Sequence, residues 1–235
     1  MSREIAEDFV NLGVFIEEFN LSGIAKNSEL LERMKPMHKK LFALMTFVAE
    51  LEQKNTELKV LSPDGLNYLK ESVSDMGQAL FCWIQGAYKP ANLILRSSIE
   101  TYVRAIAGQN NKDIFTEKSV YIVFDMAKES SYFNAEMSRE FFDSIHSKYK
   151  ELCKIVHTGS AASMSHISAL KTFPIFSTIE AQSVCRDFVI ISTGMLSIIY
   201  INFFKFIHTM HPHNQNNLFC SIPKSTKRKV NEIKG

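Results

Sequence analysis

The sequence predicts an all-α protein folded as a single helical bundle, and three observations support this prediction. Glycine and proline, which disfavour helices, account for only 9 and 6 of the 235 residues. No segment shows the alternation of apolar and polar side chains that a half-buried strand requires. Hydrophobic residues make up 46% of the chain and charged residues 22%, a composition that can bury a core.

The chain shows no internal repeat, no low-complexity linker and no break in composition. We therefore expect one bundle of about seven helices over residues 1–222. The remaining residues, 223–235, read PKSTKRKVNEIKG and are locally basic. Such an end is typical of a flexible, solubilising tail, with contact to phosphates as the alternative.

Apolar periodicity, turn residues and caps give the expected order of the helices. Proline removes a backbone donor, so Pro36 should kink or split the second helix. Pro90 suits the first turn of the fourth helix, and Asn134 is a candidate N-cap for the sixth. We expect the polar stretch His211 to Asn217 to end the ordered region. The expected helices cover about 3–19, 28–58, 65–88, a fourth from 90 that includes 93–108, then 113–128, 134–157 and a long one from 178, with a small-residue loop over 157–174.

Charge and cysteine usage indicate a cytoplasmic protein. The net charge of +2 is too small to imply nucleic-acid binding by itself. The four cysteines, Cys82, Cys153, Cys185 and Cys220, lie in different segments and form no CxxC pair, which argues against a disulfide framework or a zinc ribbon. The first residues, MSREIAEDFVNLG, are acidic where a secretion signal would have a basic region and an apolar core.

One segment has the composition of a membrane anchor. The stretch FVIISTGMLSIIYINFF, residues 188–204, carries no charge for 17 residues, which is the lower limit for a spanning helix. The same expected helix contains Glu180, Arg186 and Asp187 near its start. We interpret it as the central helix of a bundle that does not bind a membrane, and a tail anchor is the alternative.

The sixth expected helix carries a polar, basic stripe that could perform RNA chemistry. Arg139, His146 and His157 are separated by seven and eleven residues, close to whole turns, so they share one face with Lys150 and Cys153. An arginine can hold a phosphate bidentately and stabilise its developing charge. A histidine can move the proton of a ribose 2′-hydroxyl or of the leaving oxygen. The alternative is an ordinary solvated face.

A second charged stripe lies in the otherwise apolar stretch LILRSSIETYVRAIAG, residues 93–108. Arg96, Glu100 and Arg104 follow one another at intervals of four and share one helix face. One interpretation is a half-buried ion cluster that fixes helix packing. The other is a phosphate site in which Glu100 orients Arg96 beside His157. Arg104, Lys150 and Lys154 are candidate contacts to nucleic-acid phosphates.

These residues resemble the HEPN superfamily of small helical bundles. Arg139 and His146, with six residues between them, fit the Arg-x4–6-His pattern of that superfamily. The stretch 93–108 and the segment KELCKIVHTGS look like the Arg–Glu helix and the later helix end "VH" of prokaryotic HEPN-like and abortive-infection proteins, with Arg96, Glu100 and His157 at those positions.

The resemblance covers roughly residues 90–157. It implies a homodimer in which Arg and His of two copies form a metal-independent ribonuclease site. It also implies a role in toxin–antitoxin, abortive-infection or CRISPR-linked defence. The alternative is a non-catalytic helical module that binds nucleic acid or a partner protein, such as a nuclease or polymerase, of the same defence system.

No motif indicates a cofactor or a metal. His208, His211 and His213, with Cys220 downstream, match no familiar zinc spacing and are better explained as a histidine-rich helix end. The sequence contains no GxSxG elbow, P-loop or GxGxxG. We therefore expect no cofactor-binding and no metal-binding residues.

Overall fold

The computed structural model describes residues 14, 18, 19, 21, 26–156 and 174–234. These residues form ten α-helices and one 3₁₀ helix and contain no strand, which confirms the all-α prediction. The expected number, about seven, was too low because the chain forms two further short helices, Ser131–Asn134 and Phe204–Ile207, and stays helical beyond residue 211. Nearly all of the expected helix over 3–19, the candidate His157 and the loop after it lie outside the described residues. The helices are α3 (Ser28–Leu58), α4 (Pro63–Ile84), α5 (Tyr88–Ala107), η1 (Lys112–Phe115), α6 (Val120–Glu129), α7 (Ser131–Asn134), α8 (Glu136–Val156), α9 (Thr178–Asn202), α10 (Phe204–Ile207), α11 (Pro212–Ser221) and α12 (Lys224–Lys234).

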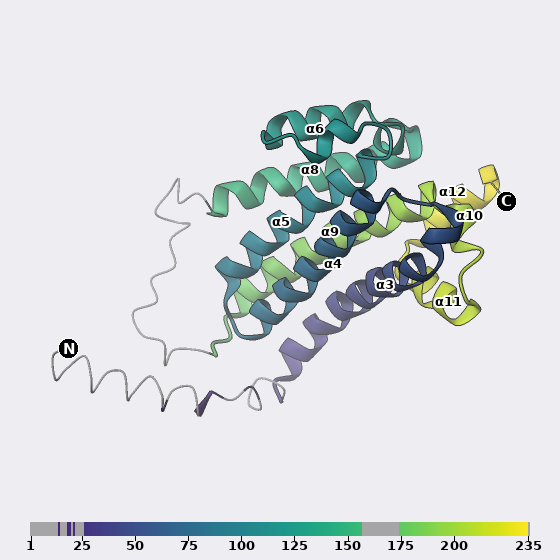
Figure 1. Ribbon diagram of the computed structural model, residues 1–235. Helices are drawn as coiled ribbons and strands as arrows, with labels where there is room; N and C mark the ends of the chain where they lie inside the picture. The colour runs from purple at the N-terminus through teal and green to yellow at the C-terminus, as the bar shows by residue number, and fades with distance from the viewer. Residues whose placement is uncertain (1–13, 15–17, 20, 22–25, 157–173, 235) are drawn as a thin grey trace.

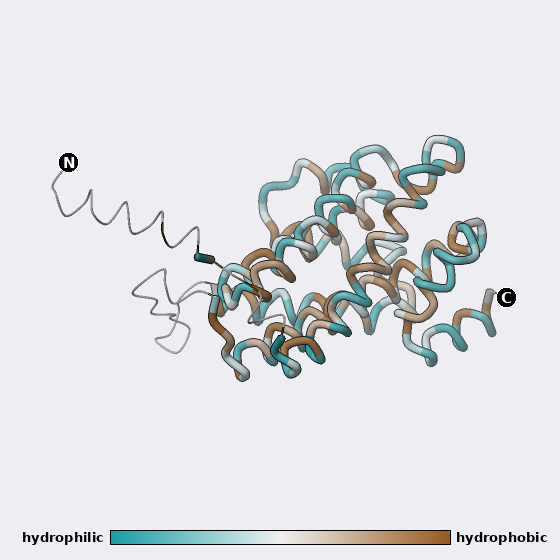
Figure 2. Tube along the Cα trace, turned by 90° about the horizontal axis from the view of Figure 1, so that it is seen from below, coloured by the Kyte–Doolittle hydropathy of each residue, from teal (hydrophilic) through white to brown (hydrophobic). Residues whose placement is uncertain are grey.

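The long helices lie side by side around α9, which Figure 1 shows in the middle of the bundle. α9 packs against α3, α5 and α8, and α4 packs along α5. α6 packs on α5 beside α8, while α10, α11 and α12 gather near the C-terminal end of α9. Hydrophobic and hydrophilic stretches alternate along the helices in Figure 2, as expected for helices that bury one face.

The central helix α9 is apolar on nearly all sides and is held by polar contacts to its backbone. The indole N–H of Trp83 donates to the Ala181 carbonyl, and the Tyr102 hydroxyl donates to the Met195 carbonyl, each at 2.9 Å. By length and composition α9 could cross a membrane, and 78% of its apolar window is buried inside the bundle. Core helices of soluble proteins pass the same test.

Pro36 does not split α3, which runs as one helix of 31 residues. The helix starts after Asn27, whose side-chain oxygen accepts the backbone N–H of Leu30 at 3.0 Å. Leu30 before the proline and Met37 and Leu41 after it are all buried. Packing of this continuous face offsets the backbone hydrogen bond that the proline removes.

The expected helix over 113–128 is divided, because a side chain of α5 engages the backbone in its first half. Arg104 donates to the carbonyl oxygens of Ile114 and Glu117, the second at 2.8 Å. These bonds tie the end of η1 and the residues after it to α5, and α6 starts only at residue 120.

Two asparagines mark helix ends near each other in space. Asn134 is the last residue of α7 rather than the cap of the following helix, which corrects the sequence-based assignment. Asn202 ends α9, and its amide donates to the carbonyls of Ile198 at 2.9 Å and of Tyr132 at 3.0 Å. The second bond ties the end of α9 to α7.

The chain remains helical where we expected an end of order at residue 211 and a flexible tail after 222. α11 and α12 occupy these residues. Val230 of α12 is fully buried and Thr226, one turn earlier, is 4% exposed. The Tyr200 hydroxyl of α9 donates to the Asn231 side chain at 2.8 Å. The spacing of Thr226 and Val230 gives α12 a short buried face, and its lysines and arginine lie mainly on the other faces.

Glu50 joins α3 to the start of α11. Its side chain is 4% exposed and lies 2.8 Å from the ammonium of Lys54. It accepts hydrogen bonds from the backbone N–H of His211 at 3.1 Å and from the amide of Asn214 at 2.7 Å. Burial raises the pKa of Glu50, but these hydrogen bonds and the charge of Lys54 outweigh burial, so the pKa is lowered.

We expect Glu50→Ala to lower the free energy of unfolding by about 2–4 kcal/mol, because it leaves three donors without their acceptor. Since the folded pKa is depressed, this contribution is present above the ordinary carboxyl pKa and is lost as pH falls through the folded pKa. Urea denaturation at neutral and acidic pH measures both effects. Glu52→Ala is the matched control, since Glu52 is 54% exposed, and it should cost under about 0.5 kcal/mol. Equal losses of unfolding free energy in the two variants would contradict the role of Glu50 in joining α3 to α11.

Candidate functional site

Three helices converge on a cavity of about 540 Å³. On α8 the main lining positions follow the spacing i, i+3, i+4, i+7 and i+8, and on α6 the spacing i, i+3, i+4 and i+7, so each helix presents one stripe. The lining residues are Arg96 from α5, then Val120, Tyr121, Phe124, Asp125 and Lys128 from α6, and His146, Tyr149, Lys150, Cys153 and Lys154 from α8.

The wall of this cavity carries more positive than negative charge. Arg96, Lys128, Lys150 and Lys154 are four cations, and Asp125 is the one carboxylate among the lining residues. Lys128 lies 2.8 Å from Asp125, and their hydrogen bond lowers the pKa of that carboxyl. Lys150 and Lys154 are exposed and form no ion pair within the described part of the chain. The cavity therefore favours an anionic ligand.

His146 lies half-buried in the cavity wall. Its ring stacks on Phe124 of α6, with 4.4 Å between ring centres and 10° between the planes. Burial lowers the pKa of His146, and the charges of Lys150 and Lys128 lower it further than two neighbouring aspartates raise it. The imidazole is therefore neutral at neutral pH and can accept a proton.

Arg96 is held by its own helix and by α8. One guanidinium nitrogen lies 3.0 Å from Glu100, one turn along α5. The guanidinium carbon lies 5.7 Å from the centre of the Tyr149 ring, and the Tyr149 hydroxyl donates to the same Glu100 oxygen at 2.8 Å. Burial and the adjacent Glu100 charge raise the pKa of Tyr149 far above its usual range, so the phenol keeps its proton and this arrangement persists.

The structure brings together residues that the sequence placed in separate pairs. Arg96 and His146 line the same cavity, with Lys150 and Lys154 on its exposed side. Arg139 is exposed and does not line it. Because Arg139 lies about two helical turns, roughly 10 Å, before His146 along α8, the two residues of the Arg-x6-His pattern do not share this cavity.

The second charged stripe also separates into two parts. Arg96 and Glu100 form an ion pair with side chains 23% and 19% exposed, as the i,i+4 spacing predicts. Arg104 instead donates to the two backbone carbonyls after α5. Arg104 therefore has a structural role, and its contact with a phosphate stays a prediction.

Sequence reasoning missed the aromatic side chains of the cavity. Tyr121 is 84% exposed, and Phe124 and Tyr149 line the wall beside it. The Tyr149 hydroxyl reaches Glu100 of α5. A tyrosine one turn before a phenylalanine is only a weak indication of a binding site in a sequence. The two rings lie next to the cations only because α6 packs beside α8.

Comparisons with known proteins give no match to a protein family, to a curated protein or to a solved structure. Within the described residues, no three His, Cys, Asp or Glu side chains gather closely enough to hold a metal ion.

We expect an NMR titration of His146 to give a pKa below the ordinary value of 6.5. Lys150→Gln should raise this pKa by removing a repelling cation, and Asp125→Asn should lower it by removing an attracting anion. Lys35→Gln on α3, where Lys35 is 69% exposed, is the matched control and should leave it unchanged. A pKa above 6.5, or no response to Lys150→Gln, would show that the ring lies in a different environment.

Proposed function

We propose that the cavity between α5, α6 and α8 binds the phosphodiester backbone of RNA and is a site of metal-independent RNA cleavage. The observation that carries this proposal is that Arg96, His146 and two exposed lysines line one cavity, where burial lowers the pKa of His146. Arginine and lysine are the side chains that bind phosphate. A neutral imidazole beside them is the group that a 2′-hydroxyl needs as a base.

The proposed reaction is an intramolecular transesterification. His146 accepts the proton of a ribose 2′-hydroxyl, and the 2′ oxygen attacks the adjacent phosphorus. The bond from phosphorus to the 5′ oxygen breaks, and that oxygen takes a proton from water. The products are a 2′,3′-cyclic phosphate and a 5′-hydroxyl. Arg96 holds the non-bridging oxygens and stabilises the charge that develops on them.

The finer identity that we propose is an HEPN-like protein of bacterial defence, acting in the cytoplasm as a homodimer with a toxin-type or abortive-infection role. The support for this identity is the resemblance over residues 90–157 together with an all-helical fold. Light scattering of the purified protein tests the dimer, and sedimentation without detergent tests the absence of membrane binding.

The alternative function is that of a non-catalytic helical module that binds RNA or a partner protein of a defence system. One observation favours it: Arg139, the arginine of the Arg-x6-His pattern, does not line the cavity that contains His146. This alternative and the enzyme differ in whether bound RNA is cut.

For RNA binding, we expect Lys150→Ala combined with Lys154→Ala to weaken binding of a labelled single-stranded RNA. Affinity falls as the salt concentration rises, and the plot of log affinity against log salt concentration should become shallower. The magnitude of its slope should decrease by roughly 1.4, about 0.7 for each phosphate that a lysine no longer neutralises. Fluorescence anisotropy at several salt concentrations measures this slope. The control removes the same charge at Lys35 and Lys70, which are 69% and 43% exposed on α3 and α4. An equal loss of affinity in both double variants would mean that only net charge matters.

For cleavage, we expect His146→Asn to slow cutting of end-labelled RNA in EDTA by roughly a hundredfold or more, the usual contribution of a general base. Arg96→Lys keeps the charge but loses the planar fork, so it should retain intermediate activity. Arg139→Ala should cut as the wild type does. Intact RNA with the wild type would favour the binding module, and equal cutting by His146→Asn would place the chemistry elsewhere.

For base recognition, we expect Tyr121→Ala to weaken binding of single-stranded RNA by about fivefold or more, because stacking on an aromatic ring contributes roughly 1–3 kcal/mol per base. Tyr121→Phe should bind normally. Ile122→Ala is the neighbouring control, since Ile122 is 47% exposed but does not line the cavity. Anisotropy with an abasic oligomer of equal charge gives the second control, since its binding should not change in Tyr121→Ala.

A further inference from the structure

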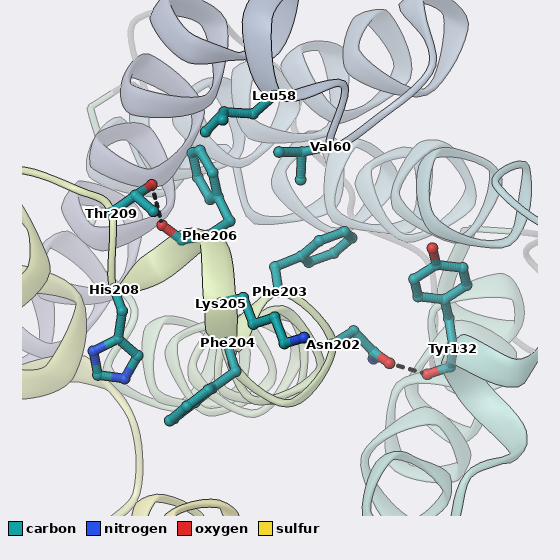
Figure 3. Close-up of a pocket in the computed structure, with 10 residues that line it drawn as sticks. All are labelled: Leu58, Val60, Tyr132, Asn202, Phe203, Phe204, Lys205, Phe206, His208 and Thr209. Atoms are coloured by element: carbon teal, nitrogen blue, oxygen red, sulfur yellow. Dashed lines mark hydrogen bonds between the residues drawn. The ribbon is translucent and has the colours of Figure 1, made fainter. Parts of the chain in front are cut away.

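A second cavity, of about 920 Å³, lies where α9 gives way to α10. None of its lining residues belongs to the cavity that contains His146. Cavities of roughly 300–1,000 Å³ with mostly apolar walls and a few polar groups are the usual form of small-molecule sites. The lining residues, drawn in Figure 3, are Leu58, Val60, Tyr132, Asn202, Phe203, Phe204, Lys205, Phe206, His208 and Thr209.

The body of this cavity is apolar. In Figure 3 the side chains of Leu58, Val60, Phe203 and Phe206 point toward a common space. Phe203 and Phe206 are each 6% exposed and pack on Phe47 in the core, with 6.1 and 5.7 Å between ring centres. Leu58 is 44% exposed at the edge. A rigid aromatic floor under an open edge suits a hydrocarbon chain.

Two polar groups at the rim have no protein partner within the described part of the chain. Among these residues, the ammonium of Lys205 forms no ion pair, and the hydroxyl of Tyr132 has no hydrogen-bond partner. Asn202 lies between them and is not available in the same way, because its amide already donates hydrogen bonds to the carbonyls of Tyr132 and Ile198. The cavity therefore presents one cation and one hydroxyl donor to a ligand.

The C-terminal ends of two long helices contribute a negative electrostatic potential, which opposes the positive charge of Lys205. α3 and α9 both end beside this cavity, and helix C-termini carry roughly half a negative charge. Their last carbonyls are partly engaged, since Asn55 accepts the N–H of Lys59 at 2.9 Å and Ile199 accepts the N–H of Phe203 at 2.8 Å. Lys205 lines the cavity with an exposed side chain that carries a whole positive charge, so the site can still pair with an anion.

We propose that this cavity binds a free amphipathic anion, namely a medium-chain aliphatic carboxylate. The hydrocarbon chain lies on Phe203, Phe206 and Val60. The carboxylate pairs with the ammonium of Lys205. This site does not depend on RNA binding at the other cavity.

The first test is displacement of the fluorescent anion 1-anilinonaphthalene-8-sulfonate from the full-length protein by octanoate and decanoate. Each buried methylene contributes roughly fourfold in affinity, so decanoate, with two more methylenes, should bind about fifteenfold more tightly than octanoate. Decylammonium, which has the same chain and the opposite charge, should bind at least about fivefold more weakly than decanoate. Equal binding of decanoate and decylammonium would overturn the proposal.

Substitutions of residues that line the cavity test where the ligand binds. Lys205→Gln should weaken decanoate binding by about three- to fivefold, the scale of an exposed ion pair, and should not weaken the binding of decylammonium, which Lys205 repels. Val60→Asp should weaken decanoate by more than about tenfold, because it puts a charge against the chain. Lys70→Gln on α4 is the control and should bind normally.

Melting curves check that each variant is folded. If Val60→Asp does not fold, Lys205→Gln alone decides the result, because its position is exposed. Unchanged decanoate binding in Lys205→Gln would overturn the proposal. If the wild type sediments with phosphatidylglycerol vesicles and Val60→Asp does not, the cavity binds a membrane surface. That result would also overturn the proposal of a free carboxylate ligand.

Discussion

α9 has almost no side that can face water, and the burial of this helix determines where the other helices lie. Removing so much apolar surface from water requires partners around it, which α3, α5 and α8 provide. α8 comes especially close, because a Cβ added at Gly194 would lie 2.8 Å from Ile145. The buried Asp187 of α9 is paired with Lys148 of α8 at 3.0 Å. Together these contacts fix both the distance and the rotation of α8 against α9.

That rotation positions the proposed RNA site. Ile145 is fully buried against α9, and the next residue, His146, lies toward α6, where it stacks on Phe124. Side chains that bind or react are held best by helices whose own packing is rigid. The stripe from His146 to Lys154 meets this condition, because the opposite face of α8 is part of the core. Arg96 gains the same support from Glu100 and Tyr149.

The sequence predicted what depends on spacing within one helix and missed what depends on contact between helices. Helical periodicity indicated the all-α class, and the i,i+4 spacing indicated the pairing of Arg96 with Glu100. Arg104 has the same spacing from Glu100, but its role was set by carbonyls that only the tertiary fold brings near. Tyr121 and Phe124 became neighbours of the cations because α6 packs beside α8. The helix α12 was missed because its buried face is only Thr226 and Val230 within a basic segment.

Trp83 gives the molecule a built-in optical reporter. It is the one tryptophan of the chain, its side chain is fully buried, and its indole N–H is bound to the backbone of α9. It lines neither the cavity that contains His146 nor the one beside Lys205. Its emission therefore follows the docking of α4 on the central helix, and undocking exposes the indole to solvent. Ligands that occupy either cavity leave this signal free to monitor the integrity of the native state in the same sample.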